Sequence, residues 1–110
     1  MILLLRERAT PEQLELMLRS HKFYIKTAVD IERRVLVGGG GLHVDCEEKL
    51  LDDGSRQQDI WAASFMPITG KIIYESMVNL RPRQNRSMEL LDPNIRERVA
   101  QLINEFLVNL

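Results

Sequence analysis

Apolar and polar side chains alternate with a period of two along three segments of the chain, a pattern typical of β-strands. The first segment covers residues 23–31, and a short β-branched run at residues 35–37 follows as the second arm of a hairpin. The other two cover residues 57–66 and 72–80, with a hairpin loop at residues 67–70 between them. With the apolar run that opens the chain, the pattern predicts about five strands.

A helix at each end of the chain is predicted from its start signal. Thr10 and Gln13 form a capping box around a proline, which begins an amphipathic helix that ends near Ser20. Asp92 and Pro93 begin the C-terminal helix in the same way. Its seven apolar positions recur at helical spacing: Ile95, Val99, Leu102, Ile103, Phe106, Leu107 and Leu110.

A third, short helix is predicted between the two hairpins. Asp45 and Glu48 have the spacing of a capping box, with Asp45 as the N-cap, and apolar residues follow them. The helix should run to about Asp53, and Gly54 suits its C-terminal cap because glycine tolerates left-handed backbone.

This order of elements predicts a single α+β domain over residues 1–110. We expect an antiparallel sheet of about five strands built from two hairpins, with the N-terminal and C-terminal helices on one face and the short helix between the hairpins. One face of the sheet would then lie open. Trp61, Phe65, Ile73 and Met77 are expected to form an exposed apolar patch there, which predicts self-association as a two-fold homodimer.

Composition narrows the class of protein. Apolar residues make up 45% of the chain and charged residues 28%, as in an ordinary soluble domain. The net charge is −1, so nucleic acid is not an expected partner, because non-specific binding needs a broad basic surface. The opening apolar run is too short for a signal peptide, and no membrane association is expected. Cys46 is the only cysteine, which excludes an intrachain disulfide and favours the cytoplasm.

The densest set of reactive side chains follows the four glycines at positions 38–41. In an extended segment His43 and Asp45 would project from one side and, with Glu47 and Asp59, could bind a divalent metal. In a helix His43 and Glu47 would meet instead. Either geometry supplies only two ligands, so no metal site is predicted. The simpler interpretation is that Asp45 and Glu48 cap the helix and that His43 is hydrogen-bonded to a carboxylate.

Two other chemistries for this segment are weaker. A glycine turn before a helix can bind phosphate, but the first turn here is acidic and no Gly-Lys-Ser/Thr motif follows. Cys46 at a helix start could be a nucleophile, yet neighbouring carboxylates disfavour its thiolate. A buried and unreactive cysteine is therefore predicted.

Three arginines are concentrated in a polar segment near the C-terminal helix. Arg81, Arg83 and Arg86 could hold a phosphate, a carboxylate or an RNA strand, although no aromatic residues are interleaved with them. The segment at residues 45–59 carries six acidic residues. The simplest expectation is that the arginines pair with it, within one chain or across a dimer.

Residues 39–61 and the run from Leu80 through Arg81-Pro82-Arg83-Gln84 to Met88-Glu89 resemble a family of small uncharacterised prokaryotic proteins, a domain of unknown function. The resemblance covers nearly the whole chain. It implies one intact domain and carries no activity, so it assigns no role to any residue.

We interpret the chain as a small binding or interaction module, homo-oligomeric, whose notable surface joins the acidic segment to the arginines. The candidate binding residues are His43, Asp45, Glu47, Asp59, Arg81 and Arg83. The alternative is a metal-dependent or acid-base enzyme, hydrolase-like, which uses the histidine and acidic cluster while an arginine holds an anionic substrate. Convergence of these side chains in one pocket would favour the enzyme. The sequence assigns no catalytic residue, cofactor or small-molecule ligand.

Overall fold

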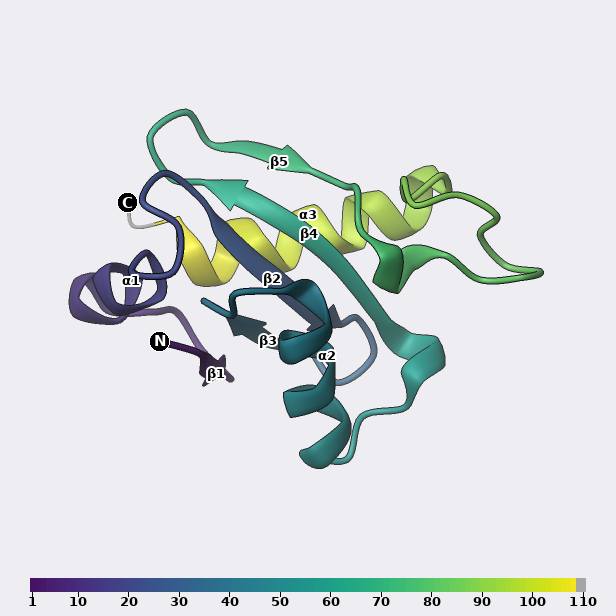
Figure 1. Ribbon diagram of the computed structural model, residues 1–110, viewed down its shortest axis with the longest axis horizontal. Coiled ribbons are helices and arrows are strands. Elements are labelled where there is room, and N and C mark those ends of the chain that lie inside the picture. The colour runs from purple at the N-terminus through teal and green to yellow at the C-terminus, as the bar shows by residue number, and fades with distance from the viewer. Residues whose placement is uncertain (109–110) are drawn as a thin grey trace.

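The computed structural model describes residues 1–108 and contains a five-stranded antiparallel sheet in the order β1-β3-β2-β4-β5 (Figure 1). The predicted α+β class and the two hairpins are therefore confirmed. The central strand β2 pairs with both β3 and β4, so the two hairpins lie side by side. The strands are β1 (Leu3–Leu5), β2 (Ile25–Asp30), β3 (Val35–Gly38), β4 (Ile60–Met66) and β5 (Lys71–Ile73).

Three α-helices and two short 3-10 helices complete the structure. The predicted start signals are confirmed at both ends of the chain, because Thr10 forms its capping box with Gln13 and Asp92 accepts from the backbone N–H of Asn94. The helices are α1 (Pro11–Met17), α2 (His43–Asp52) and α3 (Pro93–Leu107), and the 3-10 helices are η1 (Gln57–Asp59) and η2 (Met77–Asn79). Leu110, the last of the predicted apolar positions of α3, lies outside the described residues.

Several predicted boundaries are wrong. Helix α1 ends at Met17 instead of near Ser20. Residues 57–59 form η1 before β4 begins, and β5 ends at Ile73 although apolar and polar residues alternate as far as Leu80. Beyond Ile73 the alternation continues without a strand partner, because Glu75 forms only an isolated bridge with Glu89, the chain then turns into η2, and Arg81 forms a second isolated bridge with Asn85.

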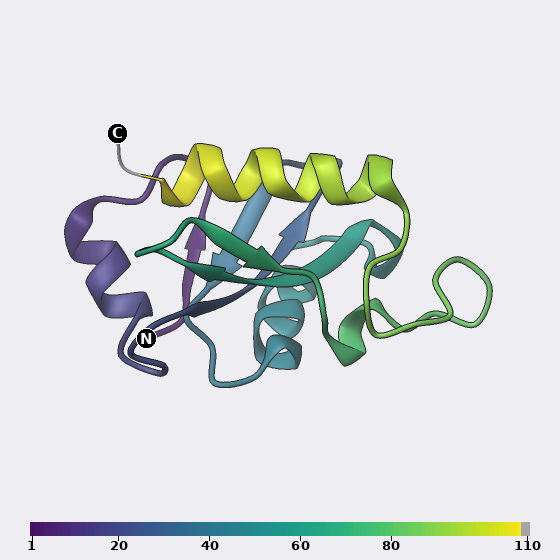
Figure 2. The same ribbon diagram turned by 90° about the horizontal axis from the view of Figure 1, so that it is seen from above.

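Helices cover both faces of the sheet (Figure 2). On one face, Val99 and Ile103 of α3 pack with Val29 and Trp61, and Met17 of α1 belongs to the same apolar cluster. On the opposite face, α2 packs against a second cluster. That cluster contains Ala28, Val35, Val37, Cys46, Leu50 and Ile60.

The predicted open face and its apolar patch are wrong. Trp61 and Phe65 are each 1% exposed because they lie under α3, and Ala28 on the other face is buried under α2. Met77 is 74% exposed, but it lies in η2 and not in a strand next to β4. Of the predicted patch, Trp61 and Phe65 therefore lie in the core, and Ile73 is half-buried.

Over residues 1–108, no helix is both long enough and apolar enough to cross a bilayer.

Candidate functional site

The glycine turn before α2 is tightly packed. Gly39 has φ +92°, and a Cβ there would lie 2.2 Å from the carbonyl oxygen of Met1. A Cβ on Gly40 would lie 2.9 Å from Sγ of Cys46. Close approach of backbone and side chains therefore explains why these positions are glycine, without an appeal to a phosphate.

Helix α2 begins at His43, two residues before the predicted N-cap. Its N-cap is Leu42, and Oδ2 of Asp45 accepts a hydrogen bond from the backbone N–H of Leu42 at 3.2 Å. The prediction that Asp45 accepts a backbone N–H at this helix start is confirmed, but Asp45 lies inside the first turn and is not the N-cap. Its carboxylate thus offsets the unpaired donors of the helix start.

His43 points from the first turn of α2 toward β4. Its Nε2 lies 3.1 Å from the carbonyl oxygen of Ala63 and 3.1 Å from Oγ of Ser64. Because a carbonyl oxygen only accepts, Nε2 carries the proton and donates it there. Burial lowers the pKa of His43 to about 4, so the imidazole is neutral near pH 7. The predicted hydrogen-bonded histidine is present, although its partners are a carbonyl and a hydroxyl and not a carboxylate.

Cys46 is buried, as predicted. Burial raises the pKa of its thiol to about 11, and Sγ donates to the carbonyl oxygen of Lys26 at 3.5 Å. A protonated thiol is a poor nucleophile. The Cys46 side chain instead packs in the apolar cluster between α2 and the sheet.

Arg81, one of the candidate binding residues, lies inside the protein. Its guanidinium stacks on the ring of Trp61, 4.1 Å from the ring centroid. The residue as a whole is 8% exposed. It donates to the carbonyl oxygens of Val78, Gln58 and Ile60. Burial lowers the pKa of Arg81, while the nearby carboxylates of Glu47 and Asp59 raise it. The donors of Arg81 are thus occupied by carbonyl oxygens of the chain itself, and the residue lies at one end of the sheet.

Two buried asparagines fix the segment that follows η2. The Asn79 side chain donates to the carbonyl oxygen of Ala62 at 2.9 Å and accepts from its N–H at 2.8 Å. Asn85 donates to three carbonyl oxygens of the same segment, including that of Ser87, and accepts from the N–H of Leu91. Residues 82–87, which we call the arginine loop, project from the body on this scaffold (Figure 2).

The arginines of this loop face solvent. Arg83 is exposed, and among the described residues it has no hydrogen-bond or ion-pair partner. Arg86 is exposed as well, and only its Nε is engaged, by the carbonyl oxygen of Pro82 at 2.8 Å. Over residues 1–108, neither arginine pairs with the acidic segment of its own chain.

A groove of about 360 Å³ lies between α2 and η2. Its most exposed apolar side chains are Met77 at 74%, Leu80 at 51% and Val44 at 50%. Glu47 is its only carboxylate, and Oε2 of Glu47 is enclosed yet accepts no hydrogen bond from any described residue. The full lining is Val44, Glu47, Gln57, Met77, Val78 and Leu80.

The predicted metal ligands are not brought together. Asp45 faces a second, shallow groove against β1, Glu47 faces the first groove, and Nε2 of His43 faces β4. Among residues 1–108, no group of three or more histidine, cysteine, aspartate or glutamate side chains could hold a metal ion. The side chains of the enzyme alternative therefore do not converge in one pocket.

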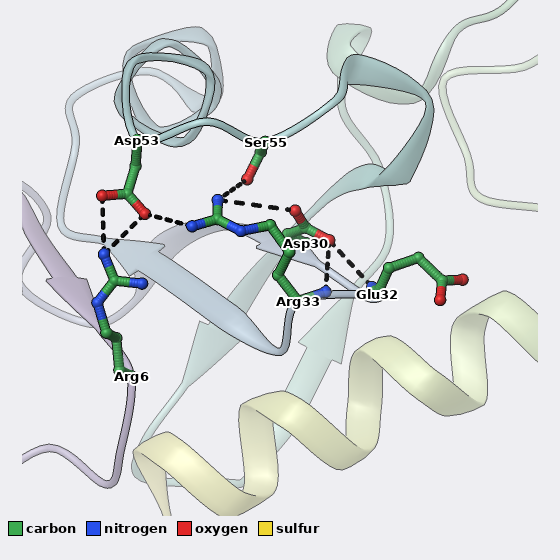
Figure 3. Close-up of polar contacts among 6 residues, drawn as sticks. All are labelled: Arg6, Asp30, Glu32, Arg33, Asp53 and Ser55. Carbon is green, nitrogen blue, oxygen red and sulfur yellow. Dashed lines mark hydrogen bonds and ion pairs between the residues drawn. The ribbon is translucent and has the colours of Figure 1, made fainter.

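The sequence reading missed an ionic network at the C-terminal end of α2 (Figure 3). Arg33 donates to Oδ2 of Asp53 at 2.8 Å and to Oγ of Ser55 at 2.7 Å. Arg6 donates to both carboxylate oxygens of Asp53 at 2.8 Å. Hydrogen bonds from Arg33 and Arg6 hold the pKa of Asp53 below its usual range.

Asp30 is the buried member of this network. It is fully buried, and its Oδ1 accepts the backbone N–H groups of Glu32 and Arg33, which closes the turn between β2 and β3. Aspartate is common in turns because its side chain accepts a hydrogen bond from the backbone N–H two residues later. Asp30 was therefore the one sequence signal that pointed to this region.

The chain belongs to a family described as a protein of unknown function, DUF5674, whose model matches residues 3–106. The expected membership in a family of unknown function is thereby confirmed. No curated protein and no solved structure matches the chain. The residues themselves must therefore carry the argument about function.

Proposed function

We propose that this protein is an interaction module that binds a protein segment in the groove between α2 and η2. The observation that carries the proposal is the grouping of the exposed apolar side chains of Val44, Met77 and Leu80 around one charged residue, Glu47, in the same groove. Exposed apolar side chains grouped around a polar anchor are characteristic of interaction surfaces.

The chemistry of the groove defines the segment that would bind. Its apolar walls favour a leucine, isoleucine or methionine side chain, because burial removes apolar surface from water. Glu47 favours a neighbouring arginine or lysine, because its carboxylate is the one charged group that lines the groove among the described residues. The proposed ligand is therefore a segment in which a basic residue stands beside an apolar one.

The enzyme alternative has less support. It needs His43, Asp45 and Glu47 to act on one substrate, whereas their polar atoms face β4, the start of α2 and the groove, respectively. The arginine assigned to hold a substrate is also committed elsewhere if it is Arg81, because three carbonyl oxygens of the chain occupy its donors.

In this proposal the 110 residues act as one domain in the cytoplasm, and the module is homo-oligomeric. A protonated, buried Cys46 suits a reducing compartment. Self-association would use the groove and not the hairpin face, since α3 and α2 cover that sheet.

A library of random 12-residue peptides displayed on phage tests the proposal, with affinities of selected peptides measured by fluorescence anisotropy. We expect enrichment of sequences that place arginine or lysine beside an apolar residue. Glu47→Gln should weaken their binding about tenfold or more. Glu48→Gln is the matched control, because Glu48 is the next residue of α2 but lies outside this groove. Equal binding by both variants, or no enrichment, would refute the proposed function.

A further inference from the structure

We infer that the occupant of the groove is the arginine loop of a second copy of this chain, exchanged reciprocally in a two-fold dimer. The inference rests on the proposed function, because it names the partner of the same groove. Each copy would supply one groove and one loop, so that the site of either protomer is completed by its partner.

The charges of the two surfaces are complementary. Of the four carboxylates of α2, Glu47 lines the groove, whereas Asp45, Glu48 and Asp52 line the second groove against β1. The arginine loop carries two exposed arginines, Arg83 and Arg86, and no acidic residue. Surfaces of opposite charge steer association and fix the register of the complex.

The groove end of α2 keeps a negative excess even with Arg81 beside it. Glu47 and Asp59 both act on the Arg81 guanidinium, so two carboxylates stand against one cation. Arg81 also donates to carbonyl oxygens, and neither carboxylate lies within ion-pair distance of it in the described part of the chain. A second guanidinium at Glu47 would therefore complete the charge balance.

The loop cannot serve its own groove. It leaves the body directly after Leu80, which lines the groove, and both views show it extending away from α2 (Figures 1 and 2). Asn85 holds it in that direction through its hydrogen bonds to the backbone of the same segment. A carboxylate in the groove and a guanidinium at the loop tip can meet only between two molecules.

Preorganisation of the loop favours this use. Because Asn79 and Asn85 already fix the backbone on which Arg83 and Arg86 stand, little backbone freedom is lost on docking. Reciprocal exchange doubles the contact, since a two-fold axis buries the same pair of surfaces twice. It would also cover Met77 and Leu80, which are otherwise exposed.

Light scattering and sedimentation at micromolar concentration test the inference on the full chain. The wild-type protein should be a dimer that dissociates as salt is raised, because exposed ion pairs are screened. The double variant Arg83→Glu/Arg86→Glu should be monomeric, and so should Glu47→Lys. A dimer that survives either charge reversal would overturn the inference.

Mixing the two charge-reversed proteins gives the decisive measurement. In a heterodimer the glutamates of one loop face Lys at position 47, and the arginines of the other loop face an unchanged Glu47. Both contacts are complementary again, so the 1:1 mixture should form dimers that neither variant forms alone. Absence of heterodimer would overturn the reciprocal exchange.

If Glu47→Lys fails to fold beside Arg81, Met77→Lys replaces it as the variant that blocks the groove, because Met77 lines the groove, is exposed, and its substitution by a cation repels the arginines while leaving the core intact. Circular dichroism melts check folding. Met77→Lys should be monomeric, and a dimeric Met77→Lys would overturn the inference.

The failure of this inference and the failure of the proposed function can be told apart. A partner's loop would compete with displayed peptides, so the peptide measurement is repeated with Arg83→Glu/Arg86→Glu, whose groove is free. A monomeric wild-type protein that binds basic peptides through Glu47 overturns the dimer and keeps the proposed function. Absence of peptide binding in both proteins overturns the proposed function.

Discussion

Arginine stands in two contrasting settings in this protein. At the C-terminal end of α2, Arg33 and Arg6 converge on Asp53, and each makes hydrogen bonds that join segments far apart in the sequence (Figure 3). In the arginine loop, Arg83 and Arg86 stand on an equally well-bonded backbone but meet no carboxylate of the described chain. The first region uses its charges to close the fold, and the second leaves them free for a partner.

The difference between the two regions lies in what holds the backbone. Around Asp53 the charged side chains themselves link the segments, whereas the loop backbone is held mainly by neutral asparagines, and Arg86 adds one hydrogen bond from Nε to the carbonyl oxygen of Pro82. Exposed charges contribute little to the stability of the fold, so they are available for binding. Variants of the two regions should therefore separate stability from association.

Arg81, at the base of the loop, should give the largest effect on stability. Arg81→Ala removes the contact with the Trp61 ring and leaves buried carbonyl oxygens without donors. We expect a loss of about 3 kcal/mol in the free energy of unfolding, measured by urea denaturation. Arg83→Ala, two residues away and exposed, should change it by less than about 0.5 kcal/mol. Similar losses of stability in the two variants would contradict the distinction between Arg81, which stabilises the fold, and Arg83, which does not.

Asp30 should give the next largest effect, within the ionic network. Asp30→Ala strips the acceptor from two backbone N–H groups in the turn after β2, so we expect a loss of about 2 kcal/mol on urea unfolding. Asp30→Asn keeps an acceptor oxygen and should lose less. Asp52→Ala, at an exposed aspartate of α2, should be close to wild type. A wild-type midpoint for Asp30→Ala would mean that the network does not contribute to the fold.

The smallest effect concerns pH. Arg33 and Arg6 lower the pKa of Asp53 in the folded state, so its contribution is present above the unfolded pKa of about 3.9 and is lost as pH falls through the folded pKa. Below about pH 4, wild-type stability should therefore fall more steeply than that of Asp53→Asn, as followed by urea midpoints. Parallel curves would show that the two arginines do not act on Asp53.

His43 provides an internal reference for that titration. Because burial lowers its folded pKa to about 4, its contribution is present above the unfolded pKa of about 6.5 and is lost as pH falls from there toward 4. This loss is common to wild type and Asp53→Asn and cancels when the two are compared.

Local signals were sufficient for much of the fold. The capping box at Thr10 and the cap at Asp92 act within one helical turn, and the alternation along β2 and β4 depends only on neighbouring residues. The position of α2 was not predictable in the same way. Its two buried side chains, Cys46 and Leu50, are enough to cover a sheet face of small residues such as Ala28, and that match is a tertiary property.

The candidate site was predicted only in part. Sequence reasoning found Asp45 at a helix start and a buried Cys46. It expected Arg83 to pair with the acidic segment, and within the described residues of one chain Arg83 does not. It could not separate Arg81 from Arg83, because only the stacking of Arg81 on Trp61, twenty residues earlier, distinguishes the two. The network between Arg33 and Asp53 likewise joins residues that only the folded chain brings together.

The hydrogen bonds of Asn79 affect the tendency of the protein to aggregate. The pairing of β5 with β4 does not reach Ala62, so the N–H and C=O of Ala62 would lie at an open sheet edge. The side-chain amide of Asn79 accepts from that N–H and donates to that C=O, as a neighbouring strand would. Unoccupied edges are templates on which foreign strands grow into aggregates. A single side-chain amide thus occupies the backbone groups of β4 at Ala62, and it allows the chain to turn away into a projecting arm without exposing the sheet edge at that residue.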